Sequence, residues 1–388
     1  MTVPAGKDER LDVFTRLGVR SVINAFETMS RVGGSRIRPE VVEAMRNASG
    51  TFVFLHELQE RVGARVAELT RNEAAVVTNG ALAGMLLATA ACLRRANGSA
   101  PRPIALPTGW SRTEVIVQRC QYSAYVPNIT QVGATIVDVG YAAQRTPEYL
   151  FEAAISDRTA AVFYTAGRPF ERFGVGLERV VAIAHAHDLP VIVDGAALLP
   201  PVSNLWRYTE IGADLVVFSG GKGLRGPQDS GVVVGRKSLI DEIHQLNSPQ
   251  HGLGRPLKSS KEDIVGFLIA LELALDEDEA RVYDDYLRQA EKVMADLAGA
   301  PGIETWVLPD GRQGQPCPRT VVRLLGHSGW TREEFLQALL EGEAPILVGE
   351  LDELDDAFYV TPRSLTDEEA ALVSYRISAL LQQRAPIR

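Results

Sequence analysis

The sequence predicts an α/β fold, a mostly parallel seven-stranded sheet flanked by helices, with a smaller α+β domain after it. Two observations predict it. Seven short runs rich in Val, Ile and Phe alternate with helix-length spacers, as strands buried on both faces do. Beyond a long helical stretch, three more runs and two helices follow. We place the large domain at 55–275 and the small domain at 276–388, with an N-terminal segment, 1–54, that packs with the small domain.

Gly, Pro or polar residues bound each run of the predicted sheet. The seven runs are 74–78, 114–118, 134–139, 160–164, 190–194, 214–219 and 231–235. Helices are predicted at 58–69 and 177–187 from the spacing of their apolar residues. The longest apolar stretch, 81–93, is shorter than the roughly 20 residues that a bilayer requires, so it predicts a buried helix.

The C-terminal part begins with a helical stretch at 264–297 that carries an acidic run, 276–280, which we interpret as a solvated face or a helix junction. Strands are predicted at 303–308, 320–325 and 357–360. Helices are predicted at 331–341 and 366–383, after the capping signals Thr331 with Glu334 and Thr366 with Glu369. The Gly/Pro/Gln-rich segment 310–318 is a predicted loop.

Composition excludes several classes of protein. The 388 residues include 40 Lys plus Arg and 49 Asp plus Glu, a net charge of −9 that argues against chain-wide attraction to nucleic acid or anionic membrane. Three cysteines without metal-ligand spacing predict reduced thiols and no metal site. The polar N-terminus lacks the apolar run of a signal peptide. We therefore expect a cytoplasmic, soluble protein.

An acid and a lysine follow two strands of the predicted sheet, Asp194 after 190–194 and Lys222 after 214–219. Ligands of open α/β sheets bind at this carboxyl edge. A phosphate loop is excluded, because its spacing requires Gly at 216 and Ser or Thr at 223, which are Val216 and Gly223. A desolvated lysine can instead form a Schiff base with pyridoxal 5′-phosphate, while an aspartate keeps the pyridine nitrogen protonated.

This cofactor also requires an anion site. Asn79, Gly80 and Ala81 open a helix directly after a strand, so the first backbone N–H groups would face a phosphate, and Ser219 could add a hydroxyl. Each residue alone also has a structural interpretation: Asp194 as a helix cap, Gly80 as a turn, and Lys222 as a surface cation. Their order along the chain favours the cofactor.

Six stretches resemble the selenocysteine synthase group of fold-type I pyridoxal phosphate enzymes (L-seryl-tRNA(Sec) selenium transferase-like), and within it the shorter, ammonia-lyase-type members. The most specific stretch is FSGGKGLRGPQ. The resembling stretches are 22–45, 55–70, 74–93, 190–201, 214–236 and 254–272.

The resemblance implies a role for each matching residue. Lys222 would bind the cofactor aldehyde and Asp194 its ring nitrogen, and Ala196 would lie beside the ring. The loop 250–261 resembles a segment that reaches the active site of a neighbouring subunit, with Arg255 and Lys261 as anion contacts. The resemblance therefore implies at least a homodimer. The remaining expected cofactor contacts are Asn79, Gly80, Ala81, Gln121 and Ser219.

One position departs from the family pattern. Gln121 stands where similar enzymes place an aromatic or His side chain over the ring, and a Gln cannot stack as imidazole does. Tyr122 and Tyr125 are candidates to replace it, with packing roles as the alternative. We expect Tyr125 to contact substrate.

A substrate anion needs a cation, and Arg363 and Arg31 are the candidates, with surface ion pairs as the alternative for each. Further candidates are Arg36 near the cleft, His56 and His251 as acid or base, and Cys317 as a desulfurase thiol, although nothing around Cys317 supports that role.

These residues predict a lyase acting at Cα and Cβ of a hydroxy amino acid or amino sugar acid. Lys222 would remove the Cα proton, and loss of water and ammonia would give a 2-keto acid. A racemase, an aminotransferase or a β-replacement enzyme would use the same chemistry. Seryl-tRNA selenium transfer is the less favoured alternative, because it needs a tRNA surface, and a non-catalytic cofactor-binding protein is a further one.

Overall fold

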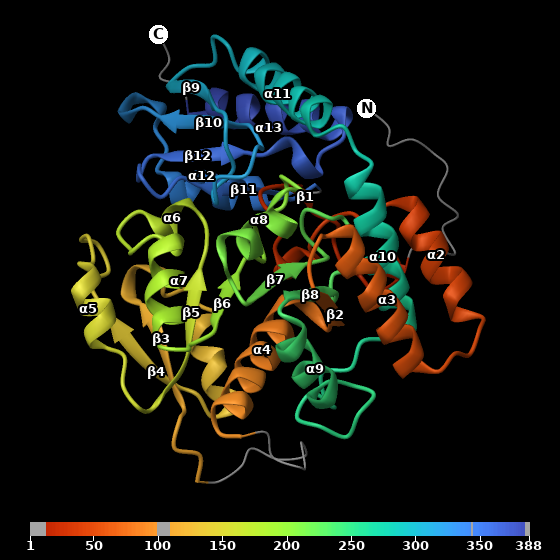
Figure 1. Cartoon of the computed structure of the whole chain (residues 1–388). Coiled ribbons are helices and arrows are strands. Elements are labelled where there is room, and N and C mark those ends of the chain that lie inside the picture. The colour runs from red at the N-terminus through yellow and green to blue at the C-terminus, as the bar shows by residue number, and fades with distance from the viewer. Residues whose placement is uncertain (1–12, 99–108, 343, 385–388) are drawn as a thin grey trace. The chain divides into compact units, whose positions relative to one another are not determined.

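The computed structural model describes residues 13–98, 109–342 and 344–384 (Figure 1). The chain divides into two compact units. The larger contains Gly33–Glu279 and Arg312–Gln315. The smaller contains the described residues up to Val32, with Ala280–Gly311 and those from Pro316 onward. The domain boundaries that we drew from the sequence stay a prediction.

The larger unit is built on a seven-stranded sheet, which confirms the predicted fold class. Its order is β2-β8-β7-β6-β5-β3-β4, and only β8 runs antiparallel to its neighbours. Every predicted strand is present with ends within one residue of the prediction. The strands are β2 (Ala74–Thr78), β3 (Glu114–Gln118), β4 (Thr135–Val139), β5 (Thr159–Thr165), β6 (Val191–Asp194), β7 (Leu215–Ser219) and β8 (Gly231–Gly235).

Helices cover both faces of this sheet, which explains why its strands are continuous apolar runs. Alternate strand residues enter two separate cores. One core, with Val193 and Phe218, packs against α2 (Pro39–Ser49), α3 (Leu55–Leu69), α7 (Leu177–Ala186), α8 (Asn204–Ile211) and α10 (Lys261–Leu275). The other, with Ile192 and Val217, packs against α4 (Gly80–Ala96) and α9 (Lys237–Leu246). Short helices α5 (Glu148–Ala153) and α6 (Arg168–Glu171) lie between strands.

The smaller unit has a five-stranded sheet of order β1-β11-β12-β10-β9. The predicted strands are β9 (Ile303–Leu308), β10 (Arg319–Leu324) and β12 (Ala357–Val360). Two strands escaped prediction, β1 (Ile23–Ala25) and β11 (Ile346–Glu350), which pair in parallel. Three residues are too few for an alternating pattern, so β1 is recognisable only through its partner.

The predicted helical stretch 264–297 forms two helices, α10 and α11 (Glu279–Asp296). They are separated at the acidic residues Asp276 to Asp278, so the acidic run marks a helix junction, one of the two interpretations that the sequence offered. A run of adjacent carboxylates at the C-terminal end of α10 is unfavourable beside the negative end of its dipole. The short helix α1 (Val13–Arg16) precedes β1.

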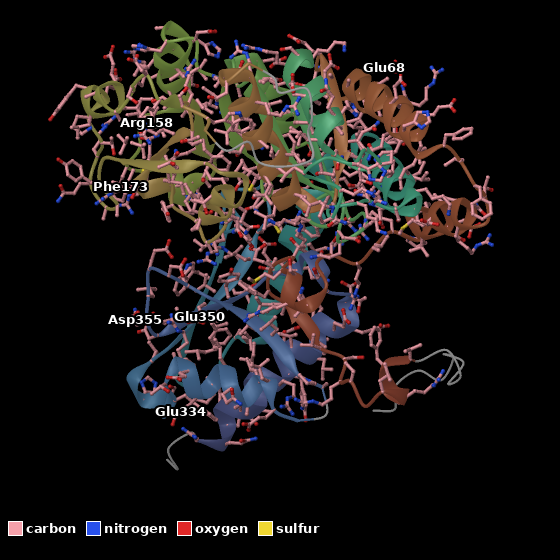
Figure 2. All side chains as sticks on the ribbon, turned by 90° about the horizontal axis from the view of Figure 1, so that it is seen from below. Glu68, Arg158, Phe173, Glu334, Glu350 and Asp355 are labelled. Atoms are coloured by element: carbon pink, nitrogen blue, oxygen red, sulfur yellow. The ribbon has the colours of Figure 1, made fainter. Side chains whose placement is uncertain are left out.

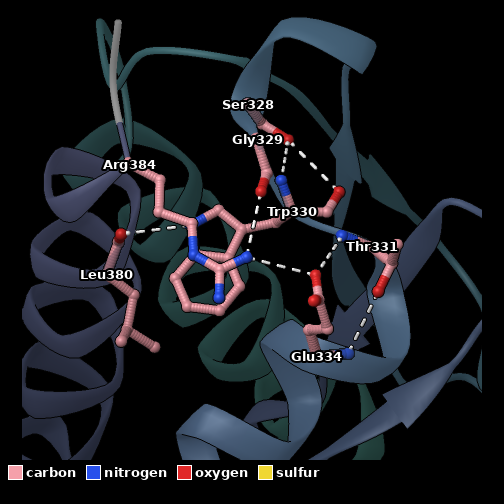
Figure 3. Close-up of polar contacts among 7 residues, drawn as sticks. All are labelled: Ser328, Gly329, Trp330, Thr331, Glu334, Leu380 and Arg384. Carbon is pink, nitrogen blue, oxygen red and sulfur yellow. Dashed lines mark hydrogen bonds and ion pairs between the residues drawn. The ribbon is translucent and has the colours of Figure 1, made fainter.

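Both predicted capping boxes are present, at the starts of α12 (Arg332–Leu340) and α13 (Asp367–Gln383). In the first, the Thr331 hydroxyl accepts from the Glu334 N–H at 3.3 Å. Figure 3 shows that the Arg384 side chain lies against Trp330 and Glu334 at the start of α12. Its guanidinium carbon lies 3.7 Å from the Trp330 ring centroid, and Nη1 lies 3.2 Å from the Glu334 carboxylate. Cap, aromatic ring and C-terminal helix thus support one another.

Ion pairs with at least one exposed side chain lie on the surface of each unit. Of the residues labelled in Figure 2, Glu68 pairs with Arg65 at 2.9 Å, Arg158 with Glu114 at 3.1 Å, and Glu350 with Arg332 at 3.1 Å. Such pairs contribute only about 0–1 kcal/mol each, so the apolar cores dominate stability. Among the helices of the described chain, none combines the length and apolarity needed to cross a membrane.

Thr331→Ala should lower the free energy of unfolding by about 1 kcal/mol, because it removes the N-cap acceptor. Thr331→Ser keeps the hydroxyl and should stay close to the parent. Urea unfolding followed by circular dichroism measures both. Equal losses in the two variants would assign the effect to the threonine methyl group instead of the cap.

Candidate functional site

Four polar side chains end four strands of the large sheet that run in the same direction. Thr78, Ser219, Asp194 and Thr165 are the last residues of β2, β7, β6 and β5. All are buried, with exposures of 0%, 8%, 8% and 3%. The residue two positions before each packs in the core against α4, so strand alternation directs all four side chains to that face. Sequence reasoning found Asp194 and Ser219 but missed Thr78 and Thr165.

Asp194 is a desolvated carboxylate. Its Oδ1 accepts a hydrogen bond from the Ala196 N–H at 3.0 Å. Burial raises the pKa of Asp194, while the Ala196 amide and the positive charge of Lys222 oppose that rise. Lys222 is therefore close enough to act electrostatically on Asp194, as expected of an acid and a lysine at one sheet edge. A desolvated carboxylate interacts strongly with any cation placed beside it.

Backbone hydrogen bonds fix the conformation of the loop that carries Lys222. The Gly220 N–H donates to the Ser230 carbonyl at 2.8 Å, and the Gly226 N–H donates to the Gly220 carbonyl at 2.9 Å. A Cβ on Gly221 would lie 2.6 Å from the Gln228 Cα, so glycine is required there by close backbone approach. The FSGGKG stretch thus fixes the position from which Lys222 extends.

The start of α4 lies beside Ser219. Gly231 pairs with both Thr78 and Ser219 across the sheet, and a Cβ on it would lie 2.7 Å from the Ala81 nitrogen. Asn79 does not cap the helix with its side chain, but donates instead to the Lys258 carbonyl at 3.2 Å. The first-turn N–H groups of α4 therefore receive no side-chain cap, which suits an anion.

Gln121 ends the short 3₁₀ helix that follows β3 and is fully buried. Within the described chain, neither of its amide atoms makes a hydrogen bond of ordinary geometry. The Tyr164 hydroxyl is its polar neighbour, and Gln121 opposes the burial that raises the pKa of Tyr164. Tyr122 and Tyr125 are exposed, at 45% and 48%. The contacts predicted for Gln121 and Tyr125 stay predictions.

The two cations of the 250–261 loop differ. Lys261 forms an ion pair with Glu262 and donates to the Ser49 carbonyl at 3.3 Å, so its charge is partly neutralised within the chain. Arg255 is exposed. Their expected role at a neighbouring subunit stays a prediction.

Arg31 and Arg363 both belong to the smaller unit. The Arg31 guanidinium carbon lies 5.8 Å from the Phe26 ring centroid, and Arg363 lies in a 3₁₀ turn after β12. Cys317 is buried, and burial raises its pKa to about 12 although Arg363 opposes the rise. A buried, protonated thiol does not suit a mobile sulfur acceptor. The substrate contacts of the two arginines stay predictions.

Arg36, His56 and His251 are all exposed. His56 packs against the ring of Phe54, with centroids 5.7 Å apart. In residues 13–98, 109–342 and 344–384, His, Cys, Asp and Glu form no cluster that could hold a metal ion.

Comparison with known proteins places these features in context. Residues 56–288 match the family model described as L-seryl-tRNA selenium transferase. A 5′-C-glycyluridine monooxygenase-decarboxylase of Streptomyces sp is 30% identical, with 95% of this chain and 92% of that protein covered. The D-glucosaminate-6-phosphate ammonia lyase of Salmonella typhimurium is 29% identical, with 96% and 99% covered.

An L-seryl-tRNA(Sec) selenium transferase of Desulfovibrio desulfuricans is 27% identical, covering 90% of this chain and 79% of that protein. Among solved structures, D-glucosaminate-6-phosphate ammonia-lyase has a TM-score of 0.83 at 26% identity, with 96% of this chain and 99% of that one covered. A Bacillus subtilis ureidoglycine-glyoxylate aminotransferase, at 16% identity and a TM-score of 0.59, shares the fold. These matches confirm the predicted resemblance, fold-type I architecture and pyridoxal 5′-phosphate cofactor.

Asp194→Asn should leave the apoprotein at least as stable as the parent at neutral pH while lowering activity by about 10²–10³-fold. The folded-state pKa of Asp194 is raised, so its charged form opposes folding, and this cost appears as pH rises through that pKa. Thermal unfolding of apoprotein and turnover of holoenzyme measure the two effects.

Asp214→Asn is the matched control. Asp214 is also buried, but it pairs with His185 at 3.0 Å and with Arg236, and accepts from the Val191 N–H. Breaking such a network should destabilise by about 3–5 kcal/mol. If Asp194→Asn destabilises the apoprotein equally, its carboxylate serves the fold and not the cofactor.

Proposed function

Because this chain belongs to the L-seryl-tRNA selenium transferase family and is a pyridoxal 5′-phosphate-dependent enzyme, we propose that it is a lyase that converts a 2-amino-3-hydroxy acid to a 2-keto acid and ammonia. The observation that carries the proposal is the likeness to D-glucosaminate-6-phosphate ammonia-lyase in both sequence and structure over nearly the whole of both chains.

The names of the relatives support this substrate class. D-glucosaminate and the seryl group both carry an amino group on C2 and a hydroxyl on C3. In 5′-C-glycyluridine, the glycyl Cα is bonded to C5′ of uridine, which bears a hydroxyl. The amino group and hydroxyl on adjacent carbons are common to all three. We infer that this chain also acts on such a pair.

The residues at the sheet edge fit the cofactor. Lys222 would hold its aldehyde carbon, Asp194 its ring nitrogen, and Ser219 with the first turn of α4 its phosphate. Thr165 lies on the same face of the sheet as Asp194, and its hydroxyl makes no hydrogen bond within the described residues. This hydroxyl would contact the ring of the cofactor. The donor set therefore matches an anionic, flat ligand with a basic ring nitrogen.

When bound, the cofactor draws electrons from the bonds at the substrate Cα, since its protonated ring is an electron sink. Asp194 would hold the proton at the ring nitrogen. Once the substrate amine has displaced it from the cofactor, Lys222 Nζ would take the Cα proton and deliver a proton to the departing C3 hydroxyl. Loss of water leaves an enamine, which takes up a proton at C3 to become a C2 imine, and hydrolysis of that imine consumes a water and releases ammonia. The net change is R–CHOH–CH(NH₃⁺)–COO⁻ to R–CH₂–CO–COO⁻ and NH₄⁺.

A second candidate function is oxidative decarboxylation, which is favoured by the 30% identity to the monooxygenase-decarboxylase. It would consume O₂ and release CO₂ from the same class of substrate. Racemase, aminotransferase and β-replacement activities stay alternatives, since each begins with the same Cα chemistry. Selenium transfer to seryl-tRNA is less favoured, because the net charge of −9 opposes a tRNA surface. The proposal further includes a cytoplasmic homo-oligomer, at least a dimer.

The test is a substrate panel. Purified holoenzyme is given D-glucosaminate, its 6-phosphate, and both enantiomers of serine and threonine, and keto acid, ammonia, O₂ and CO₂ are measured. Keto acid and ammonia in equal amounts without O₂ uptake support the lyase. O₂ uptake with CO₂ release supports the second candidate, and racemised amino acid without ammonia overturns both.

Lys222→Ala should abolish turnover and the visible absorbance of bound cofactor. Lys237→Ala is the matched control, since Lys237 lies at the start of α9 and pairs with Asp241 at 2.8 Å. Persistence of both signals in Lys222→Ala would exclude Lys222 as the residue that holds the cofactor.

A further inference from the structure

A short piece of the loop between β9 and β10 belongs to the larger unit. Residues Arg312–Gln315 group with that unit, although the strands on either side group with the smaller one. The Arg168 N–H donates to the Gln313 carbonyl at 3.2 Å, and Gln315 Nε2 donates to the Ala197 carbonyl at 2.9 Å. The 312–315 segment is therefore fastened to the chain that follows β5 and β6, beside Asp194.

The side chain of Gln313 plays no part in this fastening. Its backbone carbonyl binds Arg168, and its N–H donates to Gln315 Oε1 at 3.0 Å. The side-chain Oε1 is buried and meets no hydrogen-bond donor in the described chain. A buried acceptor left unsatisfied is destabilising, so its retention needs an explanation such as a ligand that donates to it.

Gly167 gives this oxygen its room. Its φ is +122°, a value that favours glycine, and a Cβ there would lie 3.0 Å from Gln313 Oε1. Thr165, two residues before Gly167 at the end of β5, has a buried hydroxyl that makes no hydrogen bond within the described residues. Two unsatisfied polar groups, Thr165 Oγ1 and Gln313 Oε1, therefore lie near the end of β5, where Thr165 pairs with Asp194 of β6.

We propose that Gln313 is a specificity-determining residue whose amide oxygen accepts a hydrogen bond from a hydroxyl on the substrate chain beyond C3. The proposal rests on the proposed function and names its substrate further, as a 2-amino-3-hydroxy acid with a polyhydroxylated chain. A neutral acceptor suits a hydroxyl donor and not a phosphate, which would require cations or N–H groups. Sites built to bond a substrate hydroxyl discriminate strongly against analogues that lack it.

The experiment compares D-glucosaminate with serine, which ends at the C3 hydroxyl, in holoenzyme and its variants. Gln313→Leu removes the acceptor but leaves both backbone hydrogen bonds. It should lower the ratio of kcat/KM for D-glucosaminate to kcat/KM for serine by about 10–100-fold. Gln313→Glu keeps an acceptor and should preserve most of the ratio. Gln337→Ala is the control, because the Gln337 side chain is exposed on α12 and donates to Glu341.

A binding measurement separates this proposal from the proposed function. D-gluconate has the hydroxyl chain but no amino group, so it cannot react. It should raise the Tm of wild-type holoenzyme more than lactate does, and Gln313→Leu should lose that difference. An unchanged kinetic ratio together with an unchanged gluconate shift overturns the role of Gln313. A gluconate shift that depends on Gln313 in an enzyme that releases no ammonia overturns only the lyase.

Discussion

The candidate site depends on one buried carboxylate, that of Asp194, which is largely removed from water. Asp194 ends a strand that helices cover on both sides, and burial raises its pKa. One backbone N–H and the nearby Lys222 oppose that rise without removing the cost of desolvation. A carboxylate so placed favours a cationic partner more than an exposed one could, because the surrounding dielectric is low. The ring nitrogen of the cofactor would be that partner.

Parallel strand order brings the other groups to this charge. Because β2, β7, β6 and β5 run in one direction, their last residues share one edge of the sheet. Alternation along each strand then sends the four side chains to the face covered by α4. The only antiparallel strand, β8, begins at this edge, where Gly231 allows the start of α4 to approach. The groups that we propose for the phosphate and for the ring of the cofactor therefore lie at the same edge of one sheet.

Local patterns in the chain were sufficient for most of the fold. Apolar runs identified all seven strands of the large sheet to within one residue, because each is buried on both faces and bounded by breakers. Thr331 and Thr366 located two helix starts, since a capping box is a contact between residues three apart. The acidic run at 276–280 had two interpretations in the sequence, a solvated face or a helix junction, and the structure shows the junction. β1 escaped because its three residues are too few to show an alternating pattern, and its partner β11 is distant along the chain.

The sequence by itself determined where the strands of the large sheet lie along the chain and which reactive side chains come directly after them. Asp194 and Lys222 were recognisable because each comes directly after its own apolar run. Only the tertiary structure decided that Thr165 shares a face with Asp194 and that Gln313 returns to the end of β5. Neither threonine nor glutamine is unusual where it stands. Thr165 and Gln313 stand out only because their polar atoms are buried without a partner, and that burial depends on residues distant along the chain. A local sequence pattern does not encode such contacts.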